Sequence, residues 1–255
     1  KKMFVALYTS TSAKNAKQTG EIKNDTAKIS VPIGKKRVSL GESIGMPANP
    51  KEQEITRINS YSSDRERVIE YNKKNAKGNY IIVDKSDCSA TVYDKSGKAL
   101  KKFEVGLGMD IGDKKAGGYN CGVASKIRKY TAPGEYTLGE QSNTADKKYG
   151  SNLFIMEGDG VAKDSVNEQV AAIHQIPTQR LAQRKGLFKN GTIADNRMSF
   201  GCINMLAEDF DEMEKFINGT GTKLYVLPEE KDNKLQLEPQ IDGSLKFVQT
   251  KYRDE

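Results

Sequence analysis

From residue 79 onward, short apolar segments alternate with turn-forming residues, and this spacing constrains the fold more than any other feature of the sequence. The segments are rich in β-branched and aromatic residues, and Gly, Pro, Asn and Asp stand between them. They cover residues 80–83, 90–93, 103–105, 134–138, 153–156, 171–173 and 223–227. Short strands at this spacing, without interleaved helices, predict a mainly β fold built as an antiparallel sandwich or barrel.

Two segments outside this pattern predict helices. Ser63 and Glu66 have the spacing of a capping box, in which each side chain satisfies a backbone N–H at the start of a helix. We therefore expect a helix over residues 64–76, closed by Gly78. A second helix is expected over residues 207–217, because its apolar residues recur on one face and acidic residues occupy its first turn.

The C-terminal residues are charged, but four apolar residues alternate on either side of the turn at Asp242 and Gly243. These are Leu235, Leu237, Leu245 and Phe247. Alternation around a two-residue Asp-Gly turn predicts a terminal hairpin.

The composition limits the classes of function. Hydrophobic residues make up 36% of the chain and charged residues 29%. No apolar run approaches the roughly 18 residues of a membrane span. The net charge of +7 suits an anionic partner, which could be nucleic acid, anionic lipid or an acidic wall polymer. The basic residues are scattered among acidic ones rather than interleaved with aromatics, and this distribution argues against nucleic acid.

The chain has a single histidine and three cysteines, Cys88, Cys121 and Cys202. The cysteines lack the C-x-x-C spacing of metal and redox sites, and one histidine offers no His/Cys cluster. We therefore expect no metal and no cofactor. In an oxidising compartment, Cys88 and Cys121 could form a disulfide and leave Cys202 as a thiol. The alternative is that all three remain thiols.

The stretch 198–205 carries the residues with the clearest chemistry. Cys202 follows Gly201 and stands just ahead of the helix predicted over residues 207–217. Glycine allows a substrate to approach the backbone closely, and a nearby helix dipole favours the thiolate. A thiol is only slightly ionised at neutral pH, so a nucleophilic cysteine needs an imidazole within hydrogen-bond reach. His174 is the only candidate base of this kind.

The order Ser-Phe-Gly-Cys-Ile-Asn at 199–204, preceded at a distance by Ile-His at 173–174, resembles the signature of the YkuD-type L,D-transpeptidase family. Further segments at 80–83, 93–98, 105–106 and 131–136 follow the order of similar elements in that family's catalytic domain. The resemblance implies a YkuD-like β-sandwich with a short helix after the nucleophile loop. It divides the chain into an N-terminal extension with one helix (1–77), a catalytic domain (78–228) and a C-terminal tail (229–255).

The resemblance also implies roles for individual residues. Cys202 would be the nucleophile and His174 its base, with backbone N–H groups of Gly201 and Cys202 receiving the oxyanion. The backbone carbonyl of Gln175 would orient the imidazole. Ser199 would brace the nucleophile loop through side-chain hydrogen bonds.

Two further residues are expected to contact the substrate or support the loop. By the same resemblance, Asn204 would hold either the nucleophile loop or a substrate carboxylate. The insert at 179–197 is basic and ends at Arg197. We interpret it as a lid or specificity loop, with Arg197 among the substrate-binding residues, and a solvated basic loop is the alternative.

As the resemblance implies, the substrate is a peptidoglycan stem peptide, which a cysteine thioester would transfer to a second stem in a 3→3 cross-link. Carbapenem-type inhibitors would be ligands of the same site. Action as an L,D-carboxypeptidase, with water as acceptor, is an alternative. Phe200 stands where this family commonly has His, and Gln175 stands where it usually has Gly or Ser. These departures leave a second alternative, a catalytically decayed wall-binding module.

The resemblance further implies a place in the cell envelope, periplasmic or extracytoplasmic. The first residue is Lys rather than Met, and we expect that a signal peptide has been removed. Neither a membrane span nor a nucleic-acid partner is expected.

Overall fold

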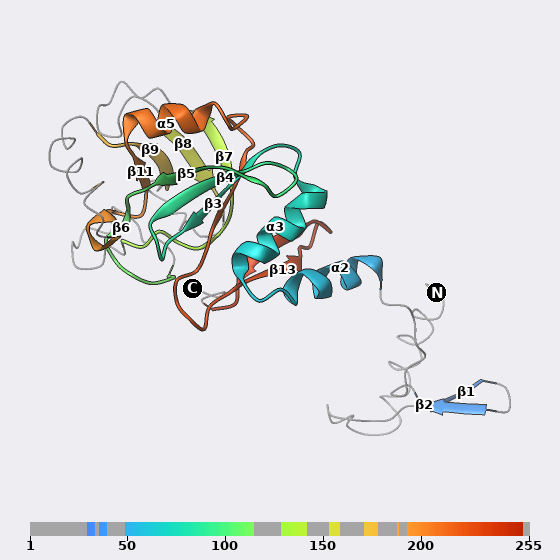
Figure 1. Ribbon diagram of the computed structural model, residues 1–255. Coiled ribbons are helices and arrows are strands. Elements are labelled where there is room, and N and C mark those ends of the chain that lie inside the picture. The colour runs from blue at the N-terminus through green and yellow to red at the C-terminus, as the bar shows by residue number, and fades with distance from the viewer. Residues whose placement is uncertain are drawn as a thin grey trace. The chain divides into compact units, whose positions relative to one another are not determined.

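The computed structural model describes residues 30–33, 36–39, 49–114, 129–141, 153–158, 171–177, 188 and 193–251 (Figure 1). The chain divides into two compact units, Lys1–Asn49 and Pro50–Glu255. In the first unit, β1 (Ser30–Ile33) and β2 (Lys36–Ser39) pair as an antiparallel hairpin. Within the described ranges, no helix is long and apolar enough to cross a membrane.

An eight-stranded sheet forms the framework of the second unit, with its strands in the order β11-β9-β8-β7-β12-β3-β4-β5. These strands are β3 (Tyr80–Asp84), β4 (Ser89–Tyr93), β5 (Ala99–Glu104), β7 (Gly134–Gln141), β8 (Leu153–Glu157), β9 (Ala172–Gln175), β11 (Ile203–Met205) and β12 (Lys223–Val226). Two smaller pairs are β6 (Leu107–Gly108) with β10 (Arg197–Ser199), and β13 (Leu235–Pro239) with β14 (Leu245–Gln249). The helices are α2 (Pro50–Asn59), α3 (Asp64–Asn75) and α5 (Ala207–Glu214), with a 3-10 turn, η4 (Ile193–Asn196).

The mainly β fold is confirmed, and α5 is the short helix expected after the nucleophile loop. The expected antiparallel arrangement is wrong for two pairs in the sheet, because β12 runs parallel to β3 and β11 runs parallel to β9. Parallel neighbours require a long connection between the two strands. Apolar spacing along a strand indicates which faces are buried but carries no information on strand direction, so the sequence did not reveal these pairs.

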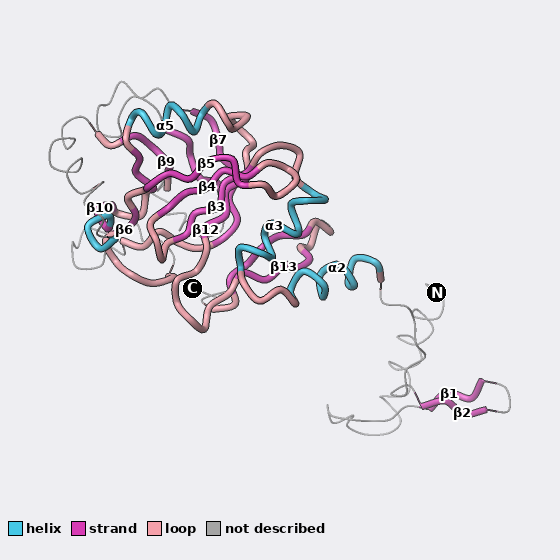
Figure 2. Tube along the Cα trace, in the orientation of Figure 1, coloured by secondary structure: helices cyan, strands magenta, loops and turns pink. Residues whose placement is uncertain are grey.

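The centre of the sheet is buried on both faces. In β3, Ile81 and Val83 belong to one apolar cluster, and Tyr80 and Ile82 to another, each at most 1% exposed. Phe210 of α5 packs in the first cluster. The second is covered by α2, α3 and the β13–β14 hairpin, which Figure 2 shows on the other side of the sheet from α5. Burial on both faces explains why β3 is a continuous apolar run in the sequence rather than an alternating one.

Helix α3 begins at the predicted capping box. The Glu66 N–H donates to Ser63 Oγ at 3.2 Å, and the Ser63 N–H donates to Glu66 Oε2 at 3.3 Å. From the same helix, Val68 is fully buried in the second cluster, and Arg67 Nε donates to the carbonyl of Leu235 at 2.9 Å. Helix α2, which precedes it, was not expected, because its sequence is mostly polar and carries only a narrow apolar face.

The predicted C-terminal hairpin is also confirmed. Leu237 and Phe247 are register partners, and both side chains are at most 1% exposed. Gly243 lies in the turn with φ +82°, a conformation that favours glycine. The hairpin therefore contributes its apolar face to the core of the second unit.

Asn59, in the last turn of α2, takes the place of a neighbouring strand at the edge of β13. Its Oδ1 accepts from the Leu237 N–H at 2.8 Å, and its Nδ2 donates to the Leu237 carbonyl at 3.0 Å. We predict that Asn59→Ala lowers the free energy of unfolding by about 1–3 kcal/mol, because both backbone groups of Leu237 lose a partner. Urea unfolding measures this change.

The matched control is Asn75→Ala, which removes an exposed hydrogen bond to the carbonyl of Tyr71 within α3. This substitution should change the stability by less than about 0.5 kcal/mol. Equal losses in the two variants would contradict the role given to Asn59.

Candidate active site

Parallel pairing of β9 with β11 brings Cys202 and His174 near each other. His174 lies in β9, and its Cα partner in β11 is Asn204. Cys202 directly precedes β11 and stands two residues before Asn204. With strands about 4.8 Å apart and a rise of about 3.3 Å per residue, an extended continuation of β11 back to Cys202 would put its Cα atom about 8 Å from that of His174. Side chains two residues apart on an extended chain share a face, so the same continuation would put the Cys202 side chain on the face of His174 and Asn204.

The opposite face of this strand pair belongs to the core. Ile173, Ile203 and Met205 are fully buried in the first apolar cluster. His174 is 3% exposed, whereas Cys202 is a thiol that retains part of its exposure. Of the two residues, Cys202 is therefore the more exposed and His174 the more buried.

The imidazole of His174 has a defined orientation. Its Nδ1 lies 2.6 Å from the carbonyl oxygen of Gln175, the contact that the family resemblance implied. A carbonyl can only accept, so this bond requires the proton on Nδ1 and puts the lone pair of the neutral ring on Nε2. A histidine in this tautomer is set up to take a proton at Nε2. The side chain of Gln175 points to α5, where its Nε2 donates to Asp211 Oδ1 at 2.8 Å.

The nucleophile loop is closed by Ser199, as predicted. Its Oγ donates to the carbonyl of Cys202 at 2.6 Å and accepts from the Gly201 N–H at 3.1 Å. Gly201 has φ +122°, a region in which any other residue is strained. The Gly201 N–H is bonded to Ser199 and so supports the shape of the loop. In this conformation it does not point to a substrate oxyanion, the role expected for it.

Thr131 supports the same loop from outside, and the sequence analysis did not single it out. Its Oγ1 donates to the Gly201 carbonyl at 3.1 Å and accepts from the Gly108 N–H at 2.8 Å. A Cβ at Gly108 would collide with the backbone carbonyl of Lys129, so the close approach of these segments requires glycine. The one indication in the sequence was that Thr131 begins the segment 131–136, one of those that follow the order of elements in the YkuD-type domain.

Asn204 is fully buried and holds the loop. Its Nδ2 donates to the carbonyl of Cys202 at 3.3 Å. Its backbone exchanges two hydrogen bonds of 2.8 Å with Gly106. Of the two roles expected for Asn204, these contacts support loop positioning rather than contact with a substrate carboxylate.

Arg197, expected among the substrate-binding residues, is instead engaged within the protein. Its side chain is 9% exposed and forms an ion pair with Glu229. Its Nη2 also donates to the carbonyl of Lys85 at 2.7 Å. These contacts give Arg197 a structural role at the start of β10. The sequence did not predict this ion pair, because Glu229 is distant from Arg197 along the chain and only folding brings the two side chains together.

Apolar side chains border the nucleophile loop. Phe200 is 41% exposed and Met109 is 39% exposed. Their backbones are neighbours, because the Met109 N–H donates to the carbonyl of Ser199 at 2.9 Å. The ammonium of Lys129 lies 5.2 Å from the centre of the Phe200 ring. The position at which the family commonly has His is therefore an exposed ring in this chain.

Some of the predicted features cannot be placed. Most of the insert at 179–197 and Cys121 lie outside the described residues. Cys88 is a buried thiol, and its Sγ lies 3.8 Å from the carbonyl of Lys85. In the part of the chain that the structure describes, no group of three or more His, Cys, Asp or Glu side chains is arranged to hold a metal ion.

A family model described as the L,D-transpeptidase catalytic domain, YkuD, matches residues 78–226. No curated protein matches the chain.

Several solved structures are similar. They include the helical cell shape determining protein Pgp2 from Campylobacter jejuni, with 18% identity over 71% of this chain and 56% of that chain and a TM-score of 0.41. An L,D-transpeptidase from Stackebrandtia nassauensis has 17% identity over 67% of this chain and 70% of that chain, with a TM-score of 0.36. LD transpeptidase LdtMt1 in complex with imipenem has 14% identity over 59% of each chain, with a TM-score of 0.32. The chain spans about half the length of the Pgp2 chains that it matches, 48% and 56%.

We predict that Gly201→Ala lowers the rate of Cys202 alkylation by iodoacetamide by about tenfold or more, because a strained alanine displaces the loop. Peptide mass mapping distinguishes Cys202 from the other thiols. The control is Gly221→Ala, which also replaces a glycine of positive φ, +89°, but with nothing within 4 Å of the new Cβ. The control should leave the alkylation rate unchanged, and a similar loss in both variants would contradict the prediction.

Proposed function

The chain belongs to the family of L,D-transpeptidase catalytic domains, and on that basis we propose that it is a peptidoglycan L,D-transpeptidase working through a thioester on Cys202. The observation that carries the proposal is the register that pairs His174 with Asn204. This register sets the single histidine of the chain beside the loop that ends at Cys202. A nucleophile with a base in reach is the minimum that acyl transfer requires.

In the first half-reaction, Nε2 of His174 takes the proton of the Cys202 thiol. The thiolate attacks the carbonyl carbon of the third residue of a donor tetrapeptide, and a C–S bond forms. We assign the backbone N–H of Cys202 as the oxyanion donor, since the Gly201 N–H is bonded to Ser199. The C–N bond then breaks, and His174 passes its proton to the amine of the departing D-alanine.

In the second half-reaction, the side-chain amine of another stem attacks the thioester. His174 takes a proton from this amine as the new C–N bond forms. The C–S bond breaks, and the sulfur regains its proton as the thiol. The product is a 3→3 cross-link. With water in place of the amine, the same steps give an L,D-carboxypeptidase.

The proposed surroundings follow from the proposed substrate. Peptidoglycan stem peptides lie outside the cytoplasmic membrane, so we place the protein in the cell envelope. A net charge of +7 favours association with an anionic wall. The proposed steps use side-chain and backbone groups of this chain and call for no cofactor.

Incubation with disaccharide tetrapeptides, followed by chromatography and mass spectrometry of the products, tests the reaction. We expect 3→3 cross-linked dimers, with a rate that falls by more than about a thousandfold in Cys202→Ala because the nucleophile is lost. Cys88→Ala is the matched control and should retain most of the activity, since that thiol is fully buried beside Arg197 and cannot meet a substrate. Tripeptides without dimers would indicate a carboxypeptidase, and neither product would indicate a wall-binding module.

Imipenem provides a second readout of the same cysteine. Intact-mass measurement should show one covalent adduct on the wild-type protein and on Cys88→Ala. No adduct is expected on Cys202→Ala, and an adduct on that variant would contradict the assignment of the nucleophile.

The pH dependence of the rate tests His174. We expect the rate to fall as the pH is lowered through the window in which imidazole titrates, about pH 5 to 8, because a protonated Nε2 cannot accept the thiol proton. Initial rates across this window measure the effect. A rate that stays flat from one end of the window to the other would argue against His174 as the base.

A further inference from the structure

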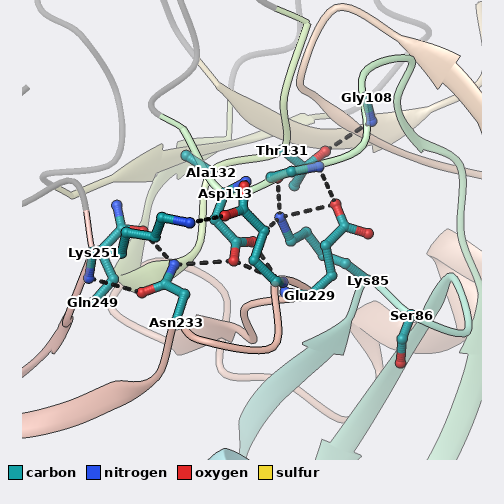
Figure 3. A network of polar contacts seen from close by, with 12 residues as sticks. Lys85, Ser86, Gly108, Asp113, Thr131, Ala132, Glu229, Asn233, Gln249 and Lys251 are labelled. Atoms are coloured by element: carbon teal, nitrogen blue, oxygen red, sulfur yellow. Dashed lines mark hydrogen bonds and ion pairs between the residues drawn. The ribbon is translucent and has the colours of Figure 1, made fainter.

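A cluster of buried charges lies beside the nucleophile loop without being part of it. Lys85, directly after β3, and Asp113 have fully buried side chains. Glu229 and Arg197 join them with side chains that are 7% and 9% exposed. Figure 3 shows the ammonium of Lys85 between the carboxylates of Asp113 and Glu229. Charges buried this deeply are costly unless they are fully paired.

The pairing of Lys85 and Asp113 is extensive. The Lys85 ammonium donates to the Gly112 carbonyl at 2.6 Å and to Asp113 Oδ1 at 2.7 Å, and lies 3.3 Å from Glu229 Oε1. Asp113 also accepts from the N–H groups of Glu229 and Glu230 at 3.0 and 2.9 Å. Burial alone would raise the pKa of the Asp113 carboxyl, but attraction to Lys85 and these hydrogen bonds hold it below its usual range.

The cluster is continuous with the C-terminal hairpin. Asn233 Nδ2 donates to Asp113 Oδ2 and to Gln249 Oε1, at 3.0 Å in each case. Figure 3 shows Asn233 between these two residues. The segment that follows β12 therefore links the buried charges to β14.

Glu229 joins β10, which leads into the nucleophile loop, to the segment that follows β6. Through one oxygen it accepts from the Gly112 N–H at 2.7 Å, on the segment that leaves β6. Through the other it accepts from Arg197 Nη2, at the first residue of β10. β6 and β10 pair in parallel, with Arg197 opposite Leu107. One carboxylate is thus bonded to the first residue of β10 and to the segment that follows β6.

The same strand pair leads directly into the nucleophile loop. β10 ends at Ser199, whose Oγ bonds Gly201 and the Cys202 carbonyl. β6 ends at Gly108, whose N–H reaches the Gly201 carbonyl through Thr131 Oγ1. A shift of β10 relative to β6 would therefore move both supports of the loop.

We propose that Glu229 and Arg197 are positioning residues, which hold the β6–β10 pair and thereby keep Cys202 aligned with His174. Glu229 lies beyond the stretch 78–226 that matches the family, so the alignment of the site depends on a segment outside the matched domain. The kinetic consequences of this inference rest on the proposed function. The geometric consequence, the reactivity of Cys202, does not.

The test compares Glu229→Gln with Glu135→Gln. Glu135 is an equally buried acid that also ties the hairpin to the sheet, through the Phe247 N–H at 3.0 Å and Lys223 at 2.9 Å. Glu135 lies in β7, and these two contacts are on β12 and β14 rather than on the nucleophile loop. Both substitutions remove one negative charge from a buried carboxylate that meets a cation and a backbone N–H. Lys223 is 46% exposed, whereas Lys85 and Arg197 are buried, so Glu135→Gln should cost less stability, and the two variants are compared as folded proteins.

For Glu229→Gln we expect kcat on tetrapeptide stems to fall about tenfold to a hundredfold while KM changes by less than about twofold, because a small displacement of a reacting group reduces the rate of the chemical step. The rate of Cys202 alkylation by iodoacetamide should fall with kcat, and its pH profile should shift. Glu135→Gln should leave kcat and the alkylation profile within about twofold of wild type. Equal losses in the two variants would overturn the inference.

Arg197→Lys keeps the positive charge but cannot reach Glu229 and the Lys85 carbonyl together as the guanidinium does. Arg197→Lys should reproduce the effect of Glu229→Gln. If Glu229→Gln does not fold, Arg197→Lys still tests the inference. Unchanged alkylation in a folded Arg197→Lys would overturn it. Alkylation needs no stem peptide, so a protein that makes no cross-links but shows these alkylation changes would refute the proposed reaction and leave the positioning role supported.

Discussion

The parallel pairing of β9 with β11 is the constraint on which the site depends. A shift of this register by one residue would turn His174 into the core and bring Gln175 or Ile173 to the face of the nucleophile. The register is held by the opposite face of the same strands, where Ile173, Ile203 and Met205 are fully buried. A hydrophobic core on one side of two short strands therefore fixes the position of His174 on the other side, where we propose the reaction.

Directional contacts complete what the core cannot specify. Apolar burial is non-directional and sets which face of a strand is hidden, but it does not define the path of a loop. The nucleophile loop takes its shape from hydrogen bonds of Ser199 and Thr131, whose angles and lengths are specific. The strands that lead into it are joined by the carboxylate of Glu229, in a buried network where every charge has an opposite partner.

Segments on either side of the matched stretch complete the fold. Tyr80, Ile82 and Tyr225 form the second face of the central strands, and α2, α3 and the β13–β14 hairpin cover it. The stretch 78–226 by itself would expose this apolar face to water. The C-terminal segment thus has two physical roles: its hairpin buries the second cluster, and residues 229–233 ahead of the hairpin anchor the charge network beside the site.

The sequence by itself determined the features that depend on neighbouring residues or on the scarcity of a residue type. Ser63 and Glu66 predicted the start of a helix because their hydrogen bonds close within one turn. The single histidine left one candidate base. Only the tertiary structure decided that β9 and β11 run parallel, that Thr131 supports the loop, and that Arg197 meets Glu229 rather than a substrate. These outcomes depend on residues far apart in the chain, and local patterns of polarity do not record which distant partner folding brings into contact.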